Sequence, residues 1–505
     1  MNDGVSIRAL KKIFEVVVLV ILMVTPAAWA AEEGEFVKKG GHWQYVPTED
    51  PWGRYLLEKG IISQEEFDRG QKILESRQRV RDPGYSVGYG NGLNIKVGDK
   101  FLLKLRVQLQ FRYNQHEYNQ AWRLVGDANN SPELVGTNLT AVRQNDSSAS
   151  TFNVRYVRLQ FLGYAFDPDL RYNLTFSADQ PEGAPNGTNG TGNVALLDAT
   201  VTSWHVPYAT VQVGQYRTWF NREEITSVAT LSFVDRNIVA ESFIANVLNR
   251  RDIGITILSD ESKYRFNYAI GIYNGAGINT DRLGIPVTAG NTRANADEHM
   301  YVARVLWNVS GRPGYGEGDI LYSRVPQIAV AAGYAYNPGL NLLNPSTAIR
   351  NQLIATSNGR LIGAGFIDFQ TWEFDIIAKY RGWALQAEGY IREQQVRGGN
   401  PLLGSATGWY VQLGKYVIPR KMEVAVRYAM MDPNTKQGQD LIKEAGVAVS
   451  YNFDGTFNHR MVTDYSNITM GTGGYAAGRP TLPSQPGYGQ DLVENRIRVM
   501  YQFYW

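Results

Sequence analysis

The stretch Phe101-Leu-Leu-Lys-Leu-Arg-Val-Gln-Leu-Gln-Phe-Arg-Tyr-Asn114 decides the fold. Every odd position from Phe101 to Tyr113 is apolar, whereas most even positions are polar and three of them carry cations. A period of two residues indicates a β-strand with two different faces. Strands of globular proteins are usually about 5–6 residues long, and a tilted membrane-spanning strand needs about 9–11. The length of the alternation therefore favours a strand that crosses a membrane.

The same alternation recurs along the chain, with an apolar face and a polar face in each segment. It is found at residues 170–176, 264–272, 301–309, 372–380 and 422–428, and aromatic residues stand at the ends of many apolar faces. Such aromatic ends form the girdles of a barrel at the two membrane interfaces. The chain has 30 Tyr and 51 Gly and a mean hydropathy of −0.30. This polar average fits a membrane barrel, since only every second residue of its strands faces lipid.

The C-terminal segment is the strongest single indication. Ile497, Val499, Tyr501 and Phe503 alternate with polar or basic residues, and the chain stops on Trp505. A final strand that ends on an aromatic residue resembles the recognition signal of the outer-membrane assembly machinery. An ordinary soluble terminus is expected to be polar and to fray.

The sequence therefore predicts an all-β protein, a transmembrane antiparallel β-barrel of about 16 strands, the number of alternating segments between residues 93 and 505. Gly- and Asn-rich stretches at 180–192, 275–290, 338–359 and 471–489 are assigned to long external loops.

Residues 1–30 have the pattern of a signal peptide: a basic start, an apolar run at 16–24 and Ala28-Trp29-Ala30 as a cleavage site. The run is too short to span a bilayer of roughly 30 Å, although a retained anchor is the alternative. Residues 31–90 are expected to form a periplasmic prefix with short helices, one at 55–58 and one that begins with a capping box of Ser63 and Glu66 and runs towards Arg79. This prefix could hang in the periplasm, rest in the lumen or form a coiled-coil contact between protomers. The barrel is assigned to residues 91–505.

Charge and composition exclude several classes. A net charge of +2 argues against nucleic acid as a partner. The absence of cysteine excludes disulfides, thiolate metal sites and covalently attached c-type haem, so no cofactor or metal is expected. The five histidines are scattered, and no catalytic motif accompanies them, so an enzyme is not expected.

The polar face of each strand must turn to the lumen, because Arg or Lys in lipid costs roughly 2–4 kcal/mol at the midplane. The expected channel lining consists of Lys104, Arg106, Arg112, Arg158, Arg171, Arg265, Arg304, Arg496 and Arg498. The expected inward anions include Asp198, Asp252, Glu373, Asp375, Glu388, Glu423 and Glu494. An excess of cations in a narrow channel attracts anions and excludes cations. The alternative is that Arg and Glu pair across the lumen and only make it rigid.

The segment 217–249 is too long for a turn and follows the fifth predicted strand, which makes it the third external loop. It has mixed charge, with Arg217, Arg222 and Arg236 among its cations. The sequence alone does not place this loop inside the barrel.

Four motifs here carry a resemblance to a known family: Val211-Gln-Val-Gly-Gln-Tyr-Arg217, Glu223-Glu-Ile-Thr-Ser227, Phe233-Val-Asp-Arg236 and Arg251-Asp-Ile-Gly254. Together they resemble the phosphate-selective porin O and P family, and the helical prefix is similar to that of the family. The resemblance implies a sixteen-stranded homotrimeric porin with an inward-folded third loop. It also implies a constriction role for Arg217, Arg222 and Arg236.

We therefore expect a porin of the bacterial outer membrane that passes small solutes and favours small anions such as phosphate, with membrane lipid around it. Two departures from the family pattern weaken the phosphate assignment, because lysines are sparse on the inward face and acidic residues are interspersed. A general non-selective porin remains an alternative. So does a barrel that sheathes a partner such as a multihaem cytochrome.

Overall fold

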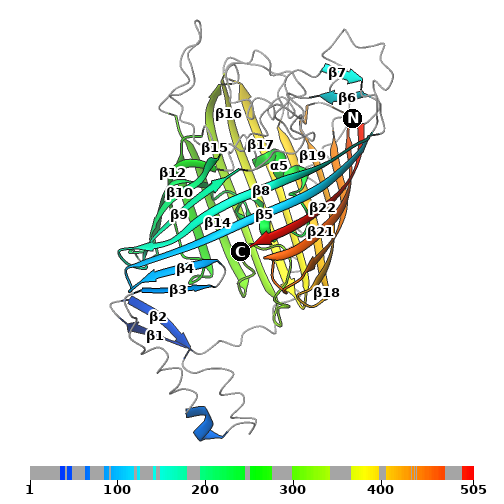
Figure 1. Cartoon of the computed structure of the whole chain (residues 1–505). Coiled ribbons are helices and arrows are strands. Elements are labelled where there is room, and N and C mark those ends of the chain that lie inside the picture. The colour runs from blue at the N-terminus through cyan, green and yellow to red at the C-terminus, as the bar shows by residue number, and fades with distance from the viewer. Residues whose placement is uncertain are drawn as a thin grey trace.

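The computed structural model describes the fold of most of the predicted barrel (Figure 1). The described residues are 34–39, 42–47, 63–68, 85–89, 92–118, 122–125, 140–143, 148–178, 194–206, 208–244, 251–275, 298–341, 366–396, 405–433, 435–436, 438, 441–471 and 492–505. The expected signal peptide and the predicted helix at 55–58 lie outside these ranges, as do the loop predicted at 180–192 and most of those at 275–290, 338–359 and 471–489.

Within the described part of the chain, sixteen strands form a closed ring in which all neighbours are antiparallel. They are β5 (Phe101–Tyr118), β8 (Ser148–Ala165), β9 (Leu170–Ser177), β10 (Ala195–Ser203), β11 (Thr210–Arg217), β12 (Arg251–Leu258), β13 (Phe266–Tyr273), β14 (Met300–Ser310), β15 (Gln327–Asn341), β16 (Phe366–Tyr380), β17 (Trp383–Val396), β18 (Ala406–Ile418), β19 (Met422–Asp432), β20 (Ile442–Asn452), β21 (His459–Met470) and β22 (Leu492–Tyr504). The predicted barrel and its strand number are confirmed.

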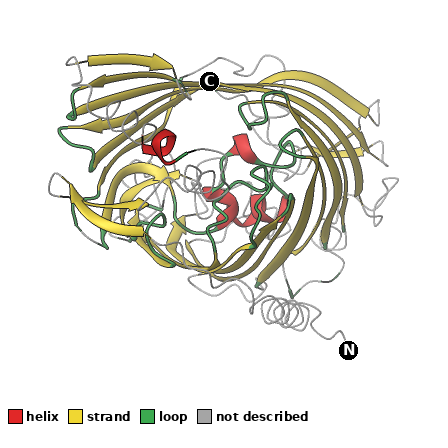
Figure 2. Ribbon diagram, turned by 90° about the horizontal axis from the view of Figure 1, so that it is seen from below, coloured by secondary structure: helices red, strands yellow, loops and turns green. Residues whose placement is uncertain are grey.

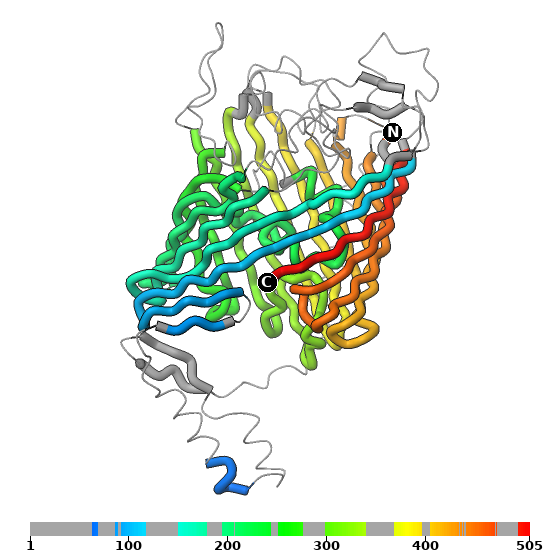
Figure 3. Tube along the Cα trace, viewed as in Figure 1, coloured from blue at the N-terminus to red at the C-terminus, as the bar shows by residue number. Residues whose placement is uncertain are grey.

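The ring closes where the last strand meets the first. β22 pairs with the second half of β5, and Figure 3 shows the blue trace of β5 beside the red trace of β22. Trp505 exchanges two backbone hydrogen bonds with Val107, at 2.8 and 2.9 Å. Beyond this point β5 pairs instead with the hairpin of β3 (Tyr85–Tyr89) and β4 (Leu93–Val97). The barrel sheet therefore extends back to Tyr85, into the stretch that the sequence assigned to the prefix.

The two faces of the strands are those that the alternation predicts. Ile270, Trp307 and Val426 are 59%, 51% and 51% exposed on the outer surface, whereas the polar residues between such positions turn inward. Aliphatic and aromatic side chains thus form the lipid-facing surface. Among the described residues, no helix is long and apolar enough to cross a membrane.

Two further small sheets lie outside the ring: β1 (Gly34–Lys39) with β2 (His42–Pro47), and β6 (Trp122–Val125) with β7 (Thr140–Arg143). The first was not expected from the sequence, which predicted only helices in the prefix. The capping box is present, because Ser63 N–H donates to Glu66 Oε2 at 2.8 Å and Glu66 N–H donates to Ser63 Oγ at 3.3 Å. The described helical residues after Ser63 are 64–68. The predicted loop at 338–359 starts too early, because β15 continues to Asn341 after an irregularity at Asn337.

Candidate channel constriction

The described part of the third external loop, residues 218–244, lies inside the ring of strands. Its helical turns α4 (Arg222–Ile225), η1 (Val228–Thr230) and α5 (Ile238–Ile244) are enclosed by the barrel wall in Figure 2. Two glycines of the wall give the loop room. A Cβ on Gly333 of β15 would lie 2.3 Å from the carbonyl oxygen of Phe220, and one on Gly408 of β18 would lie 2.7 Å from Val239. The first is a close approach of two backbones, which requires glycine. At Gly408 the space is taken by side chains of the loop.

Apolar packing and hydrogen bonds both fix the loop. Phe220, Val239 and Phe243 are buried in one cluster with Tyr390 and Tyr410 of the wall. The loop also forms polar contacts with successive strands. Asn221 donates to Glu388 of β17 at 2.9 Å, Arg222 to Asp375 of β16 at 2.9 Å and Ser232 to Glu423 of β19 at 3.1 Å. The bond between Arg222 and Asp375 joins two ionised groups, and such bonds are roughly twice as strong as neutral ones.

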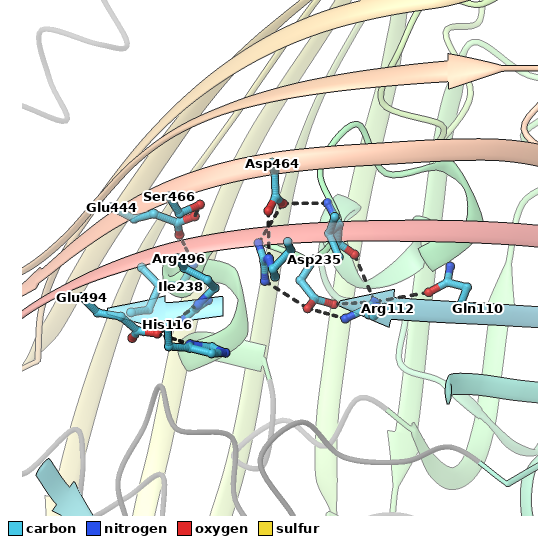
Figure 4. A network of polar contacts seen from close by, with 12 residues as sticks. Gln110, Arg112, His116, Asp235, Ile238, Glu444, Asp464, Ser466, Glu494 and Arg496 are labelled. Carbon is cyan, nitrogen blue, oxygen red and sulfur yellow. Dashed lines mark hydrogen bonds and ion pairs between the residues drawn. The ribbon is translucent and has the colours of Figure 1, made fainter. Parts of the chain in front are cut away.

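The tip of the loop reaches the seam between β5 and β22 (Figure 4). Asp235 accepts from Arg112 of β5 at 2.7 and 3.0 Å and from Arg498 of β22 at 3.1 Å. Arg498 also forms two bonds with Asp464 of β21, which accepts from the N–H of Val234 at 2.9 Å. Burial alone would raise the pKa of Asp235, but Arg112 and Arg498 hold that pKa well below its ordinary value. Asp235 is therefore an anion at neutral pH and binds the loop to the wall.

A second segment enters the barrel from the opposite end. Residues 311–326 join β14 to β15 and are far longer than the usual periplasmic turn. Glu317 accepts from the N–H of Ser232 at 2.6 Å and from Gln412 of β18 at 2.8 Å. Arg222 and Thr226 both donate to carbonyls of this segment, at 2.8 Å. We call residues 311–326 the inturned loop, because it contacts the third external loop within the lumen.

These two loops divide the inner face of the barrel into two parts. On β14 to β22 the charged inward side chains are almost completely covered, with Glu373, Arg392 and Arg460 at 0% exposure. On the first part of β5 and on β8 to β10, Lys104, Arg106, Gln160, Asn173 and Thr202 keep part of their surface in contact with solvent, and Arg171 is exposed. We call these two parts the covered wall and the open wall. The solvent-filled part of the lumen therefore lies along the open wall.

Cations follow one another down the open wall. The register of β5, β8 and β9 places inward residues in rows, with Arg158 opposite Gln108, Arg106 opposite Gln160 and Lys104 opposite Leu162. Arg171 lies in the next row, opposite Tyr164. Each of four successive rows thus holds one cation, and consecutive rows are about 7 Å apart along a strand. We call Arg158, Arg106, Lys104 and Arg171 the basic ladder; Arg158 is only 7% exposed, whereas the other three have solvent-exposed surface.

Aromatic rings support three members of the ladder. The guanidinium carbon of Arg106 lies 4.2 Å from the ring centre of Tyr504, that of Arg158 lies 4.2 Å from Tyr156, and that of Arg171 lies 4.8 Å from Trp204. Stacking on a ring face orients a guanidinium without neutralising its charge.

The remaining lining residues predicted from the sequence fall elsewhere. Arg112, Arg304, Arg496 and Arg498 belong to buried ion pairs, with Asp235, Glu373, Glu494 and Asp464 respectively. Arg265 is exposed in the turn between β12 and β13. The predicted inward anions Asp252, Asp375, Glu388 and Glu423 are buried, and Asp198 forms an ion pair with Arg251 at 2.9 Å.

The three cations predicted for the constriction are also separated. Arg217 is part-exposed and donates to the carbonyls of Glu224, Ile225 and Thr226 at 2.8–3.2 Å. It is within electrostatic reach of Asp198 together with Arg158. Arg222 is 1% exposed, and Arg236 donates to the carbonyls of Glu223 and Thr226 at 2.9 and 2.7 Å. Arg217 therefore lies at the edge of the open wall, whereas Arg222 and Arg236 lie inside the loop.

Sequence reasoning missed Arg155. The register of β8 shifts between Val154 and Tyr156, so that Arg155 is the extra residue of a β-bulge. Both Arg155 and Tyr156 then turn inward: the guanidinium of Arg155 lies 5.1 Å from the ring of Tyr156 and acts electrostatically on Asp235. The sequence holds a signal for it, because the outward apolar residues are even-numbered up to Val154 and odd-numbered from Val157.

A closed barrel with a lipid-facing apolar surface, a loop folded into its lumen and one solvent-exposed basic wall defines an outer-membrane channel of the porin class. A model of the phosphate-selective porin O and P family matches residues 134–470. The chain belongs to this family and is a porin of the bacterial outer membrane. The sequence-based recognition of the family and the predicted location are confirmed.

Other comparisons give distant likenesses. A search of curated proteins finds no match to the chain. A loop L8 deletion mutant of OmpT from Vibrio cholerae is 9% identical, with a TM-score of 0.47 over 81% of this chain and 100% of that chain. An anion-selective porin from Comamonas acidovorans is 10% identical, with a TM-score of 0.49 over 80% and 100%. The outer membrane channel DcaP of Acinetobacter baumannii is 10% identical, with a TM-score of 0.44 over 80% and 98%.

Proposed function

We propose that this porin favours small anions, which cross the outer membrane along the basic ladder between the open wall and the third external loop. The observation that carries the proposal is the division of the charges. Most carboxylates of the barrel interior are buried on the covered wall in ion pairs or hydrogen bonds, whereas cations keep solvent-exposed surface on the open wall. A path lined by one sign of charge concentrates the opposite ion.

The ladder also suits oxyanions. Guanidinium groups present several donors in one plane and bind phosphate or carboxylate oxygens in pairs. Since Arg106 and Arg171 stack on rings, their donors are pre-oriented before an anion arrives. Phosphate is therefore the first solute to test, as the family name also suggests.

In this proposal the predicted residues have two roles. Lys104, Arg106 and Arg171 contact passing anions. Arg158, which is only 7% exposed, and Arg217, which donates to carbonyls of the third external loop, act on those anions through their charge. Arg112, Arg222, Arg236, Arg304, Arg496 and Arg498 instead hold the third external loop and the covered wall in place, because their donors are engaged there.

The test is the reversal potential of the purified porin in a planar bilayer under a KCl gradient, repeated with phosphate. We expect a reversal potential with the sign of a chloride-selective channel, and a chloride current that phosphate reduces. The variant Lys104→Gln, Arg106→Gln, Arg171→Gln should shift the potential towards zero, whereas Arg420→Gln, in an exposed periplasmic turn, should not.

A reversal potential with the sign of a potassium-selective channel would contradict anion preference and leave a general porin whose arginines only stabilise the barrel. Purification with a bound haem protein and no conductance would favour the partner-sheathing alternative. The lumen of this barrel is already filled on one side by two loops, which argues against a protein partner inside it. We also propose a homotrimer on the basis of the family resemblance, and light scattering of the detergent-solubilised protein tests it.

A further inference from the structure

Two cations lie on the outer surface at the periplasmic ends of β16, β17 and β18. Lys415 of β18 is opposite Trp383 of β17, which is 49% exposed, and it shares its face with Leu413, which is 38% exposed. The neighbours Gln412 and Tyr416 turn to the interior. Lys415 is therefore on the lipid-facing side, at the level of the aromatic residues that end the strands.

The lysine is held in a defined place. Its Nζ donates to the carbonyl oxygen of Arg381 at 2.7 Å. It lies 5.0 Å from the ring centre of Trp383 and 5.3 Å from that of Tyr322 in the inturned loop. The guanidinium of Arg381 lies 5.1 Å from the ring of Tyr380. The two cations are thus joined through one carbonyl group and three aromatic rings.

The inturned loop is fastened to the β16–β17 turn so that Tyr322 reaches this place. Asp319 accepts from the N–H of Gly382 at 2.7 Å and from Ser323, and the carbonyl of Ser323 accepts from the N–H of Arg381 at 2.8 Å. Tyr322 has a φ of +55°, which an aromatic residue rarely adopts. Strain of this kind persists where the surrounding bonds enforce it, and it is common at ligand sites.

Neither cation is neutralised. In the part of the chain that the structure describes, no ion pair involves Lys415 or Arg381, and the nearby Asp319 is 2% exposed with its oxygens already engaged. A basic pair beside interfacial rings on a lipid-facing surface matches the level of lipid phosphate groups.

We propose that Lys415, Arg381 and the rings of Trp383 and Tyr322 form a binding site for an anionic phospholipid of the periplasmic leaflet. The lipid phosphate accepts hydrogen bonds from Lys415 and Arg381, and an acyl chain lies along Leu413 and Val411. A free phosphate ion would use only the two cations, whereas a lipid also covers this apolar surface. The proposal does not depend on which ion the channel favours.

Native mass spectrometry of the detergent-solubilised porin with phosphatidylglycerol or phosphatidylcholine tests the site. We expect phosphatidylglycerol to stay bound in preference to phosphatidylcholine. Lys415→Gln and Arg381→Gln should each weaken its binding about fivefold, the usual effect of one interfacial cation. Lys263→Gln is the matched control, because it removes one charge from another periplasmic turn, where Lys263 pairs with Asp260 at 3.1 Å.

An equal loss of phosphatidylglycerol binding in Lys415→Gln, Arg381→Gln and Lys263→Gln would show that only the overall charge matters. Equal binding of the two lipids would show that no headgroup is recognised. Either result overturns the proposal, as does displacement of the lipid by an equal concentration of inorganic phosphate. Unchanged heat-modifiability on gels confirms that each variant is folded, and unchanged single-channel conductance shows that the channel is intact.

Discussion

Asp235 of the third external loop lies 2.7 Å from Nη1 of Arg112 on the first strand of the barrel. This ion pair joins the tip of the loop to the seam of β5 and β22, which lies four strands away from β11 around the ring. Arg498 of the last strand contacts the same carboxylate, at 3.1 Å.

Asp235→Asn should loosen the loop, because the substitution leaves two buried arginines without their shared anion. Removal of one partner of a buried pair costs about 3–5 kcal/mol. We expect a larger and noisier single-channel conductance than in the unaltered porin, with the barrel still folded. An unchanged conductance would mean that the remaining contacts of residues 221–234 hold the loop by themselves.

The docking of the loop should also depend on pH through Glu223. Burial raises the pKa of Glu223 well above its ordinary value, and the neighbouring carboxyl groups of Glu317 and Glu388 raise it further, against Arg236 and Arg427. A carboxyl group with a raised folded-state pKa stabilises the folded form fully only below its unfolded pKa, about 4.3. This contribution is lost as the pH rises through the raised value.

Current noise should therefore increase from acidic to alkaline pH in the unaltered porin. Glu223→Gln keeps a neutral group of the same shape and should flatten this dependence. The measurement is a series of single-channel recordings from pH 4 to pH 9 in the same salt. A variant with the same pH profile as the unaltered porin would exclude Glu223 as the responsible group.

Gly163 of β8 accommodates the side chain of the opposite residue, Tyr172 of β9, whose hydroxyl donates to the carbonyl of Leu102 at 3.1 Å. A Cβ at this glycine would lie 1.7 Å from the same carbonyl oxygen. We expect Gly163→Val to destabilise the barrel by about 1–3 kcal/mol, the range for overpacked positions. Urea unfolding in detergent micelles measures it, with Gly88→Val as the control because a Cβ there has nothing within 4 Å.

Trp505 should contribute to closure of the barrel between β22 and β5. Trp505 exchanges two backbone hydrogen bonds with Val107, each worth about 0.5–1.5 kcal/mol net. Deletion of Trp505 should slow the formation of the heat-resistant form on gels, whereas Trp505→Phe keeps the backbone bonds and the aromatic end and should assemble normally. Equal assembly of all three proteins would contradict a role of the last residue.

The fold was predictable because a barrel strand encodes its environment at every second residue. The alternation from Phe101 to Tyr113 assigns both faces of one strand, and the alternation from Ile497 to Phe503 does the same for another. The third external loop was predictable from the length of 217–249. The same argument applies to 311–326, whose length was not used, so the inturned loop was missed.

The candidate site was less predictable, because parity tells which face a side chain occupies and not what covers it. Arg106 and Arg304 have the same inward parity, but only Arg304 is buried beneath a loop, between Glu373 and Asp375. That difference depends on where the third external loop docks, which is a tertiary property. Arg155 was missed because a β-bulge reverses which positions of β8, odd or even, point inward.

Mutations in the inturned loop can change the width of the channel. Residues 311–326 open to the periplasm, yet Glu317 contacts Ser232 and Gln412 in the interior. Insertions or substitutions in this loop would therefore alter the free cross-section of the channel from its periplasmic side. The surface that the barrel presents to phages, antibodies and other cells would stay the same.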